Sequence, residues 1–230
     1  MKLICPRCSS LAIAPAGSIT AARGTVKRYR CTDCNKKFHP SLREQPIIEV
    51  EGYWDIETSQ AGRGAGNFGI IYSWAILNRE SDEYENDAMR SRTRKEEKRI
   101  VTSMIDCMKT YDRLYTWYGT GHDVPISRSR AEHYGIEFPG YQEVLHTDLY
   151  FALRGKFKLH SNRQDSVAEF LGMPAQEHKL KPEIWVDALF DDTFRSAIKH
   201  IDAHCIEDVY QTKYIHERAE KYMKGTRRTI

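Results

Sequence analysis

The 230-residue sequence predicts an α/β protein in which a mixed β-sheet is flanked by helices and preceded by a small cysteine-rich module. Two observations predict this organisation. Residues 1–45 contain two Cys-x-x-Cys pairs. Residues 46–230 start with strand-like apolar runs, alternate between strand-like and helix-like segments, and end in helical periodicity. Because strands, then alternating elements, then helices indicate one mixed sheet covered by helices, we expect two domains with these boundaries.

Composition excludes several protein classes. Apolar residues make up 40% of the chain and aromatic residues 11%, which is enough for a core and excludes global disorder. No run of about 18 apolar residues is present, and the first residues, MKLICPRCSS, lack the apolar region of a signal peptide. We therefore expect a soluble, cytoplasmic protein without membrane contacts.

Positive charge is concentrated in the first domain. Residues 1–45 hold nine basic and two acidic side chains, a net charge of +7, whereas the other 185 residues hold 26 basic and 30 acidic ones, a net charge of −4. Such a distribution is expected if the first domain contacts phosphate groups.

The two cysteine pairs, CPRC at 5–8 and CTDC at 31–34, predict a structural zinc site. Without an export signal, this spacing favours metal over disulfides. Four thiolates suit tetrahedral Zn²⁺, and a module of about forty residues needs such a metal because its core is small. The strand-like TVKRYRC predicts a β-hairpin that reaches the second pair. The expected ligands are Cys5, Cys8, Cys31 and Cys34.

The segments CPRCSS and RYRCTDCNKKFHP resemble zinc ribbons at the start of transposases and other nucleic-acid enzymes. Basic side chains near the second pair can contact a nucleic-acid backbone, and Tyr29 and Phe38 among them can stack on bases. A purely structural or protein-binding module remains the alternative. The basic candidates are Lys27, Arg28, Arg30, Lys36 and Lys37.

The second domain begins with two predicted strands, residues 46–57 and 68–77, joined by the loop GRGAGN at 62–67. No helix follows this loop, which excludes a dinucleotide or P-loop phosphate site. The charged residues 79–99 predict an exposed strand or loop that enters a helix ending near residue 109.

A third strand at 112–119 is followed by a helix with Pro125 in its first turn and Gly135 at its end. Residues 144–153 predict a short strand and a helix. Short helices at 165–172 and 182–190 and a long helical segment at 192–223 complete the chain. Cys107 and Cys205 lie in helix-like segments and are expected in the core.

Four acidic residues are candidate ligands of a second metal site. Asp55 and Glu57, two positions apart on a strand, point to the same face of the sheet. Asp123 follows the third strand in a loop, and Asp208 flanks a helical apolar stripe. If they converge, their repulsion requires cations, and two Mg²⁺ or Mn²⁺ ions suit carboxylate oxygens.

Other interpretations of these acids remain open. Asp55 and Glu57 can instead form a solvated pair on a strand edge, and Asp123 can be a turn or N-cap residue. Asp148, at a strand–helix junction, is expected to cap the helix or support the site. The tryptophans are expected in the core, although Trp54 or Tyr118 can flank a terminal base.

Four segments in order resemble the DnaQ-like (DEDD) 3′–5′ exonuclease superfamily, in the branch related to the proofreading domain of family B DNA polymerases. They are WDIETS, TWYGTGHDVPISRSRAEHYGI, HTDLYFALRGKFKLHSNRQDSVAEFLGM and HCIEDVYQT. The resemblance spans roughly residues 47–222 and implies a ribonuclease H-like fold. It implies two-metal catalysis with Asp55, Glu57, Asp123 and Asp208 as ligands.

Two segments depart from this family. Tyr118 stands where relatives often have Asn, and His122 where they have Phe. His204 precedes Asp208 by four residues, where one subfamily places Tyr; another places His five residues before. At this spacing His204 lies on the same helix face and can orient or deprotonate the attacking water, as a general base. The alternative is a helix-surface histidine, as expected for His200.

The main hypothesis is a two-metal 3′–5′ exonuclease that acts on single-stranded or 3′-ended DNA or RNA, with the zinc ribbon guiding the nucleic acid. A replication or repair protein is a further candidate partner. A second hypothesis is a catalytically degenerate module that binds nucleic acid or a replication partner. A third is a transposase-like or structure-specific endonuclease with a ribonuclease H-like fold.

Overall fold

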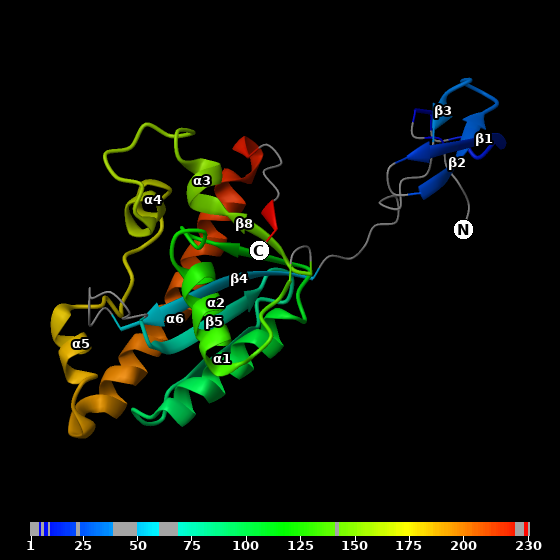
Figure 1. Cartoon of the computed structure of the whole chain (residues 1–230). Coiled ribbons are helices and arrows are strands. Elements are labelled where there is room, and N and C mark those ends of the chain that lie inside the picture. Colours follow the sequence, from blue (N-terminus) through cyan, green and yellow to red (C-terminus); the bar gives the residue numbers. More distant parts are fainter. Residues whose placement is uncertain are drawn as a thin grey trace. The chain divides into compact units, whose positions relative to one another are not determined.

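The computed structural model describes most of the chain in two compact units, Met1–Ile48 and Glu49–Ile230. Figure 1 shows the elements of both units. The predicted loop at 62–67 lies outside the described residues. The structure describes residues 5, 7–8, 10–21, 24–38, 50–59, 69–140, 143–223 and 228–229, with the backbone alone at 19–21, 24–26 and 228–229.

The first unit contains the predicted β-hairpin. Strands β1 (Ile13–Ala21) and β2 (Gly24–Cys31) are antiparallel, with Ile13 opposite Cys31. The short strand β3 (Lys37–Phe38) pairs with β2. The hairpin therefore ends at the second cysteine pair, as the sequence predicts.

The second unit is built on one mixed sheet with the strand order β6-β5-β4-β7-β8-β9. Strand β4 pairs antiparallel with β5 and parallel with β7, and β7 pairs parallel with β8. The predicted mixed sheet is confirmed. Its strands are β4 (Glu51–Thr58), β5 (Ile71–Asn78), β6 (Tyr84–Ala88), β7 (Arg113–Thr116), β8 (Leu145–Asp148) and β9 (Arg228–Thr229).

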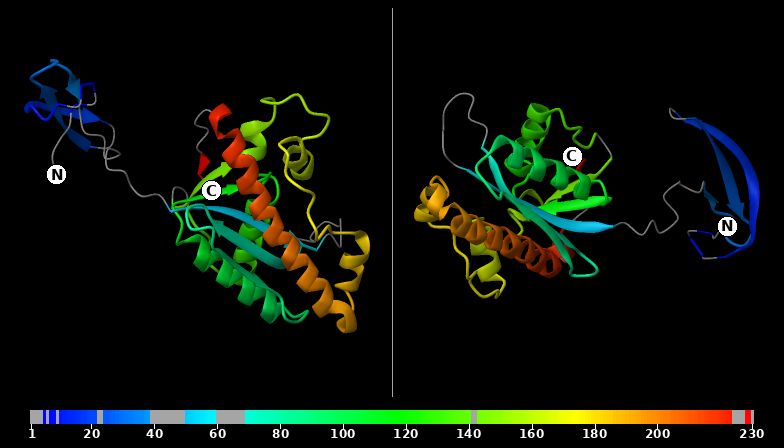
Figure 2. Two further views of the ribbon diagram at one scale, coloured as in Figure 1. Left: turned by 180° about the vertical axis from the view of Figure 1, so that it is seen from behind. Right: turned by 90° about the horizontal axis from the view of Figure 1, so that it is seen from below.

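Helices cover both faces of this sheet, with α6 on one side and α1 and α2 on the other (Figure 2). None of the helices in the described part of the chain is long and apolar enough to cross a membrane. The helices are α1 (Arg94–Met108), α2 (Asp123–Tyr134), α3 (Leu149–Leu153), α4 (Gln164–Phe170), α5 (Pro182–Asp187) and α6 (Asp191–Ala219), followed by a 3₁₀ turn (Glu220–Tyr222).

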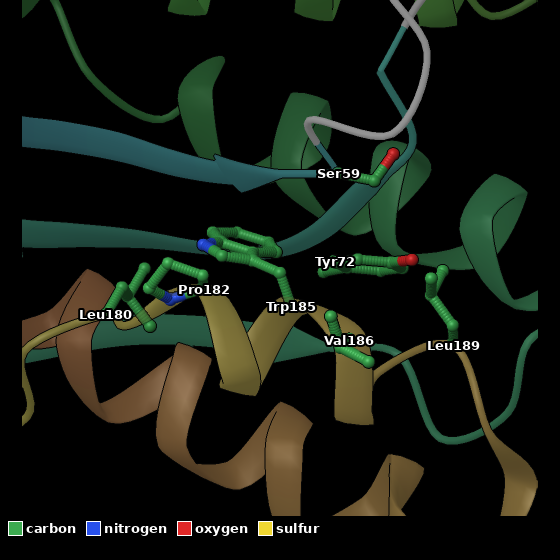
Figure 3. A pocket seen from close by; sticks show the side chains of 7 residues that line it. All are labelled: Ser59, Tyr72, Leu180, Pro182, Trp185, Val186 and Leu189. Atoms are coloured by element: carbon green, nitrogen blue, oxygen red, sulfur yellow. The ribbon is translucent and has the colours of Figure 1, made fainter.

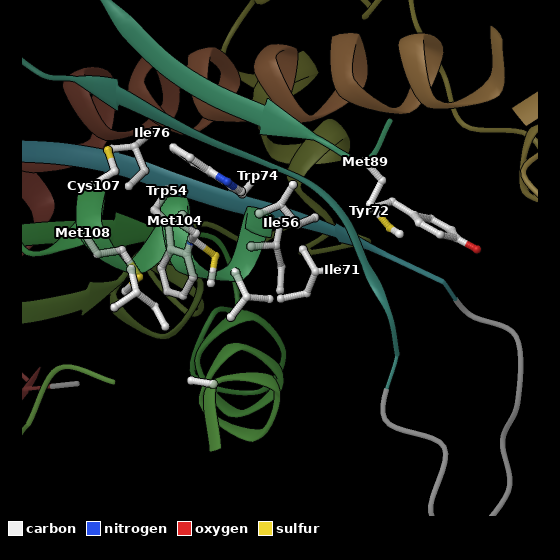
Figure 4. Packing of buried hydrophobic residues seen from close by; sticks show 14 of the residues in the cluster. Trp54, Ile56, Ile71, Tyr72, Trp74, Ile76, Met89, Met104, Cys107 and Met108 are labelled. Atoms are coloured by element: carbon white, nitrogen blue, oxygen red, sulfur yellow. The ribbon is translucent and has the colours of Figure 1, made fainter. Parts of the chain in front are cut away.

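The core on the α1 side is formed by alternate residues of the two central strands. Trp54 and Ile56 of β4 and Trp74 and Ile76 of β5 belong to a buried cluster that includes Met104 of α1 (Figure 4). Trp54 is fully buried. The interpretation that Trp54 flanks a terminal base is therefore wrong.

The opposite face of the same strands meets α6. Tyr53 of β4 and Leu77 of β5 are buried in a cluster with Cys205 and Val209 of α6. Because side chains of a strand alternate between faces, Asp55 and Glu57 project from the face that carries Tyr53. The apolar pattern of β4 thus aims both carboxylates at α6. Cys107 and Cys205 are buried, as predicted.

Candidate active site

Asp55 and Glu57 lie on a central strand. In the sheet β4 is flanked by β5 and β7, so the interpretation of a strand-edge pair is wrong. Asp55 stands opposite Ala75 and Glu57 opposite Ser73 of β5. Both residues are half-buried beneath α6.

Helix α6 contributes His204 and Asp208, one helical turn apart. Nε2 of His204 lies 3.7 Å from Oε1 of Glu57 and 3.6 Å from Oδ2 of Asp208. Sγ of Cys205 lies 3.6 Å from Oδ2 of Asp55. Asp208 flanks the buried stripe at the position that the helical periodicity indicates. The structure thus brings α6 and β4 together at these polar groups.

Asp123 reaches the same strand from α2. It is the first residue of that helix rather than a loop residue, and the N-cap position is occupied by His122. The loop placement and the N-cap interpretation are therefore wrong. Asp123 is only 2% exposed, and its Oδ1 accepts a hydrogen bond from the backbone N–H of Ile56 at 3.2 Å. This bond attaches the start of α2 to the strand between Asp55 and Glu57.

The electrostatics of the site reflect crowded carboxylates that are partly shielded from water. Burial, and then the charges of Asp123, Asp208 and Glu57, raise the pKa of Asp55 well above its ordinary value. Burial, and then the charges of Asp208 and Asp123, likewise raise the pKa of Glu57 well above its ordinary value. Burial also raises the pKa of Asp123 to about 7 and raises that of Asp208, despite the opposing effect of His204.

Two glutamines that sequence reasoning missed contact Asp208, and one of them orients its carboxylate. Nε2 of Gln176 donates to Oδ1 of Asp208. Nε2 of Gln164 donates to the backbone oxygen of Asp208 at 2.8 Å and to Oγ1 of Thr212 at 3.1 Å. Gln176 precedes α5 in a stretch without helical or strand periodicity, so the sequence carried no signal for this contact.

Asp148 supports the site as a capping residue, as predicted. Its side chain caps α3 by accepting a hydrogen bond from the N–H of Phe151. It also accepts from the N–H groups of Tyr118 at 3.2 Å and Thr120 at 2.9 Å. Asp148 thereby fixes the turn that leads from β7 to Asp123.

The donor set fits hard divalent cations. The carboxylate oxygens of Glu57 and Asp208 and a nitrogen of His204 lie within 4.8 Å of one another. The raised pKa values show that the charged forms of these acids are costly without a counter-charge. Oxygen-rich sites of this kind suit Mg²⁺ or Mn²⁺.

The four cysteines of the first unit converge. The Sγ atoms of Cys5 and Cys34 are 3.5 Å apart and those of Cys8 and Cys31 are 3.6 Å apart. All four lie within 4.8 Å of one another. With a Zn–S distance of about 2.3 Å, a tetrahedral site has sulfur–sulfur separations of roughly 3.8 Å. The cluster therefore fits zinc.

The basic candidates project from the hairpin. Lys27, Arg30, Lys36 and Lys37 are exposed and Arg28 is half-buried. Arg30 and Lys37 are paired across β2 and β3. Phe38 is buried against Cys5 and Cys31, so the interpretation that it stacks on bases is wrong.

A pocket of about 480 Å³ lies beyond the end of β4, which the sequence did not predict. Figure 3 shows the Trp185 ring of α5 beside the Tyr72 ring, and their centroids are 6.1 Å apart. Ser59, two residues after Glu57, also lines it. None of the four carboxylates is among its lining residues.

Comparisons with known proteins agree with this fold. Residues 52–220 match the family model of the RNase_H superfamily. A DNA polymerase of Methanocaldococcus jannaschii is 26% identical over 103 residues, which cover 45% of this chain and 5% of the polymerase.

Among solved structures, the family B DNA polymerase from the hyperthermophilic archaeon Pyrobaculum calidifontis matches with a TM-score of 0.62 and 16% identity. The match covers 91% of this chain and 28% of that chain, so this chain is similar to a small part of each polymerase. The expected ribonuclease H-like fold and the resemblance to family B DNA polymerases are confirmed.

Proposed function

Because the chain belongs to the RNase_H superfamily, we propose that it is a metal-dependent nuclease, and specifically a 3′–5′ exonuclease of DNA or RNA ends. The fold and the family support a nuclease-type function. The exonuclease activity and its direction rest on the order of the four motifs and on the similarity to DNA polymerases.

The observation that supports the proposal is the group formed by Glu57, His204 and Asp208, whose ligand atoms lie within 4.8 Å of one another. Asp55 shares the strand face of Glu57, and Asp123 is bonded to the backbone N–H of Ile56 between them. Such a cluster opposes folding unless cations bind there. Two bound Mg²⁺ or Mn²⁺ ions would supply an activated water and stabilise the charge on the phosphoryl group.

Within this site each side chain has a distinct task. Asp55, Glu57 and Asp208 would hold the cations between β4 and α6, with Asp123 as the fourth ligand. His204 would orient the attacking water and accept its proton, since its Nε2 faces Glu57 and Asp208.

The first unit would bind zinc through its four cysteines and contact the nucleic acid through its basic side chains. Exposed Lys27, Arg30, Lys36 and Lys37 suit phosphate groups, which attract lysine and arginine without sequence preference. The similarity to DNA polymerases makes a replication or repair protein a further candidate partner. Both roles are separate from the chemistry at the carboxylates.

The test is hydrolysis by the full chain of 3′-labelled and 5′-labelled oligonucleotides, DNA and RNA, with Mg²⁺ or Mn²⁺. We expect mononucleotides to be released from the 3′ end. Asp55→Asn should lower the rate at least about a thousandfold, whereas Asp106→Asn, an exposed carboxylate of α1, should not. Intact substrates under all conditions would contradict the proposal, and cleavage of closed circular DNA would identify an endonuclease instead.

A further inference from the structure

An aromatic cluster flanks the turn between β7 and α2. The centroid of the Tyr118 ring lies 5.0 Å from that of Tyr150 and 5.8 Å from that of Phe151. The guanidinium of Arg154 lies 5.0 Å from the Phe151 centroid and 6.0 Å from that of Tyr150. Tyr118 is nevertheless 46% exposed. The cluster thus supports one aromatic ring that remains open to solvent.

The backbone at Tyr118 adopts a conformation that bulky residues rarely take. Its φ is +63°, in the left-handed region that favours glycine. The carboxylate of Asp148 maintains this conformation through its hydrogen bonds with the N–H groups of Tyr118 and Thr120. Strain that surrounding groups maintain at an exposed residue points to a role in function.

Gly121 makes room for the Tyr118 ring. A Cβ at this position would lie 2.6 Å from Cζ of Tyr118, closer than real contacts allow. The N–H of Gly121 also donates to the carbonyl oxygen of Tyr118 at 2.9 Å. The turn therefore holds the ring over a residue without a side chain.

This turn is attached directly to the carboxylate site. The N–H of Val124 donates to the carbonyl oxygen of Gly119 at 2.9 Å, and Asp123 begins the helix that follows. Asp148 holds the same turn through the N–H groups of Tyr118 and Thr120, so the ring is carried by the turn that leads directly into Asp123.

We propose that Tyr118 is a base-stacking residue whose ring binds one unpaired nucleobase of the strand held at the carboxylates. Tyr150, Phe151 and Arg154 support the ring, and an aromatic face accepts any base because every base has a π-face. A base inside a duplex has both faces covered, so the contact requires an unpaired base. The inference rests on the proposed function, which brings nucleic acid to Asp123.

The test measures binding of the full chain to single-stranded DNA of about ten nucleotides that carries one abasic site at successive positions from the 3′ end. Ca²⁺ replaces Mg²⁺, and gel electrophoresis verifies that the strand stays intact. Loss of the base at one position should weaken binding about tenfold, or ~1.4 kcal/mol, within the range of one stacking contact.

Tyr118→Asn removes the ring, and asparagine tolerates the left-handed backbone. This variant should bind the unmodified strand about tenfold more weakly and show no further loss at the critical abasic position. Tyr118→Phe should behave as the native chain. The matched control is Tyr84→Ala. Tyr84 lies on the edge strand β6, is 45% exposed and packs against Tyr210 of α6. This control should leave binding unchanged.

If Tyr118→Asn shows the same dependence on the abasic position as the native chain, or if the native chain shows none, the stacking role is wrong. Hydrolysis with Mn²⁺ is assayed in parallel on the same strands. If the strands are hydrolysed but base loss has no effect on their binding, the stacking inference alone is overturned. If base loss weakens binding, Tyr118→Asn abolishes this dependence and no strand is hydrolysed, the stacking role is supported and the proposed nuclease function is overturned.

Discussion

His204 lies between two carboxylates from different elements. Its Nε2 faces Glu57 and Asp208, and its buried Nδ1 has no hydrogen-bond partner among the described residues. The tautomer of the ring is therefore not fixed by a hydrogen bond at Nδ1. A histidine placed between these two carboxylates can accept a proton at Nε2 when substrate is bound.

We predict that His204→Gln lowers kcat for oligonucleotide hydrolysis about 10²- to 10⁴-fold, the usual contribution of a general base, with little change in KM. His200→Gln is the matched control. His200 lies one turn earlier on α6, and its Nε2 contacts the backbone oxygen of Lys179 at 3.2 Å. Equal losses in both variants would show that His204 is only a structural residue of the helix.

His216 makes stability depend on pH. It is buried, its Nδ1 lies 2.9 Å from the Tyr53 hydroxyl, and burial followed by the charge of Arg79 lowers its pKa from 6.5 to about 4. A lowered pKa means that the neutral form is favoured in the folded state. Its contribution is therefore complete above pH 6.5 and is lost as pH falls toward 4.

We predict that acidification from pH 7 to 4.5 lowers the free energy of unfolding more in the native chain than in His216→Gln, by about 2–3 kcal/mol. Urea unfolding of the metal-free protein at both pH values measures this difference. The buried carboxylates act with the opposite sign, since their raised pKa values favour the fold at low pH, and they cancel in the comparison. Parallel pH profiles would contradict the assignment.

At the scale of elements, the segment before α5 is held to α6 by contacts with Asp208 and Glu207. Gln176 donates to Asp208. Nδ1 of His178 lies 2.6 Å from Oε1 of Glu207. This segment thereby fixes one oxygen of Asp208 and leaves the other facing His204.

We predict that Gln176→Leu raises the Mn²⁺ concentration for half-maximal hydrolysis about 10- to 100-fold, as is typical when the hydrogen-bond partner of a metal ligand is removed. His178→Ala loosens the same segment without contacting Asp208 and should leave the Mn²⁺ dependence near that of the native chain. If both variants shift it equally, the segment acts only by covering the helix.

At the scale of the whole molecule, the chain combines a small unit with the proposed zinc site and a larger unit with its own core. Among its described residues, the small unit packs Phe38 and a few half-buried residues around its cysteines. The larger unit has extensive buried clusters on both faces of its sheet. Its folding should therefore not depend on zinc.

We predict that the purified chain contains one equivalent of zinc and that Cys31→Ser abolishes zinc retention. Because metal binding is coupled to folding in modules of this size, the NMR signals of Met1–Ile48 should collapse to those of an unfolded segment. Signals of the larger unit and its thermal midpoint should remain. A native-like first unit without zinc would contradict this prediction.

Local patterns in the sequence were sufficient for most elements and for the acids. The alternation of side chains in β4 put Asp55 and Glu57 on one face of the sheet. The same alternation placed Trp54 on the other face, which already argued against the interpretation that Trp54 flanks a terminal base. Helical spacing placed His204 and Asp208 on one face of α6. The two-residue strand β9 was missed because two residues carry no periodicity.

The sequence by itself determined most of the strands and helices, the cysteine site and the carboxylate candidates, because each depends on spacing within a short segment. Only the tertiary structure decided that Gln176 holds Asp208, that Asp148 holds the turn at Tyr118, and that Phe38 faces the cysteines. The first two contacts join residues about thirty positions apart. They depend on strand order and on the path of the chain over α6, which the local periodicity of side chains does not encode.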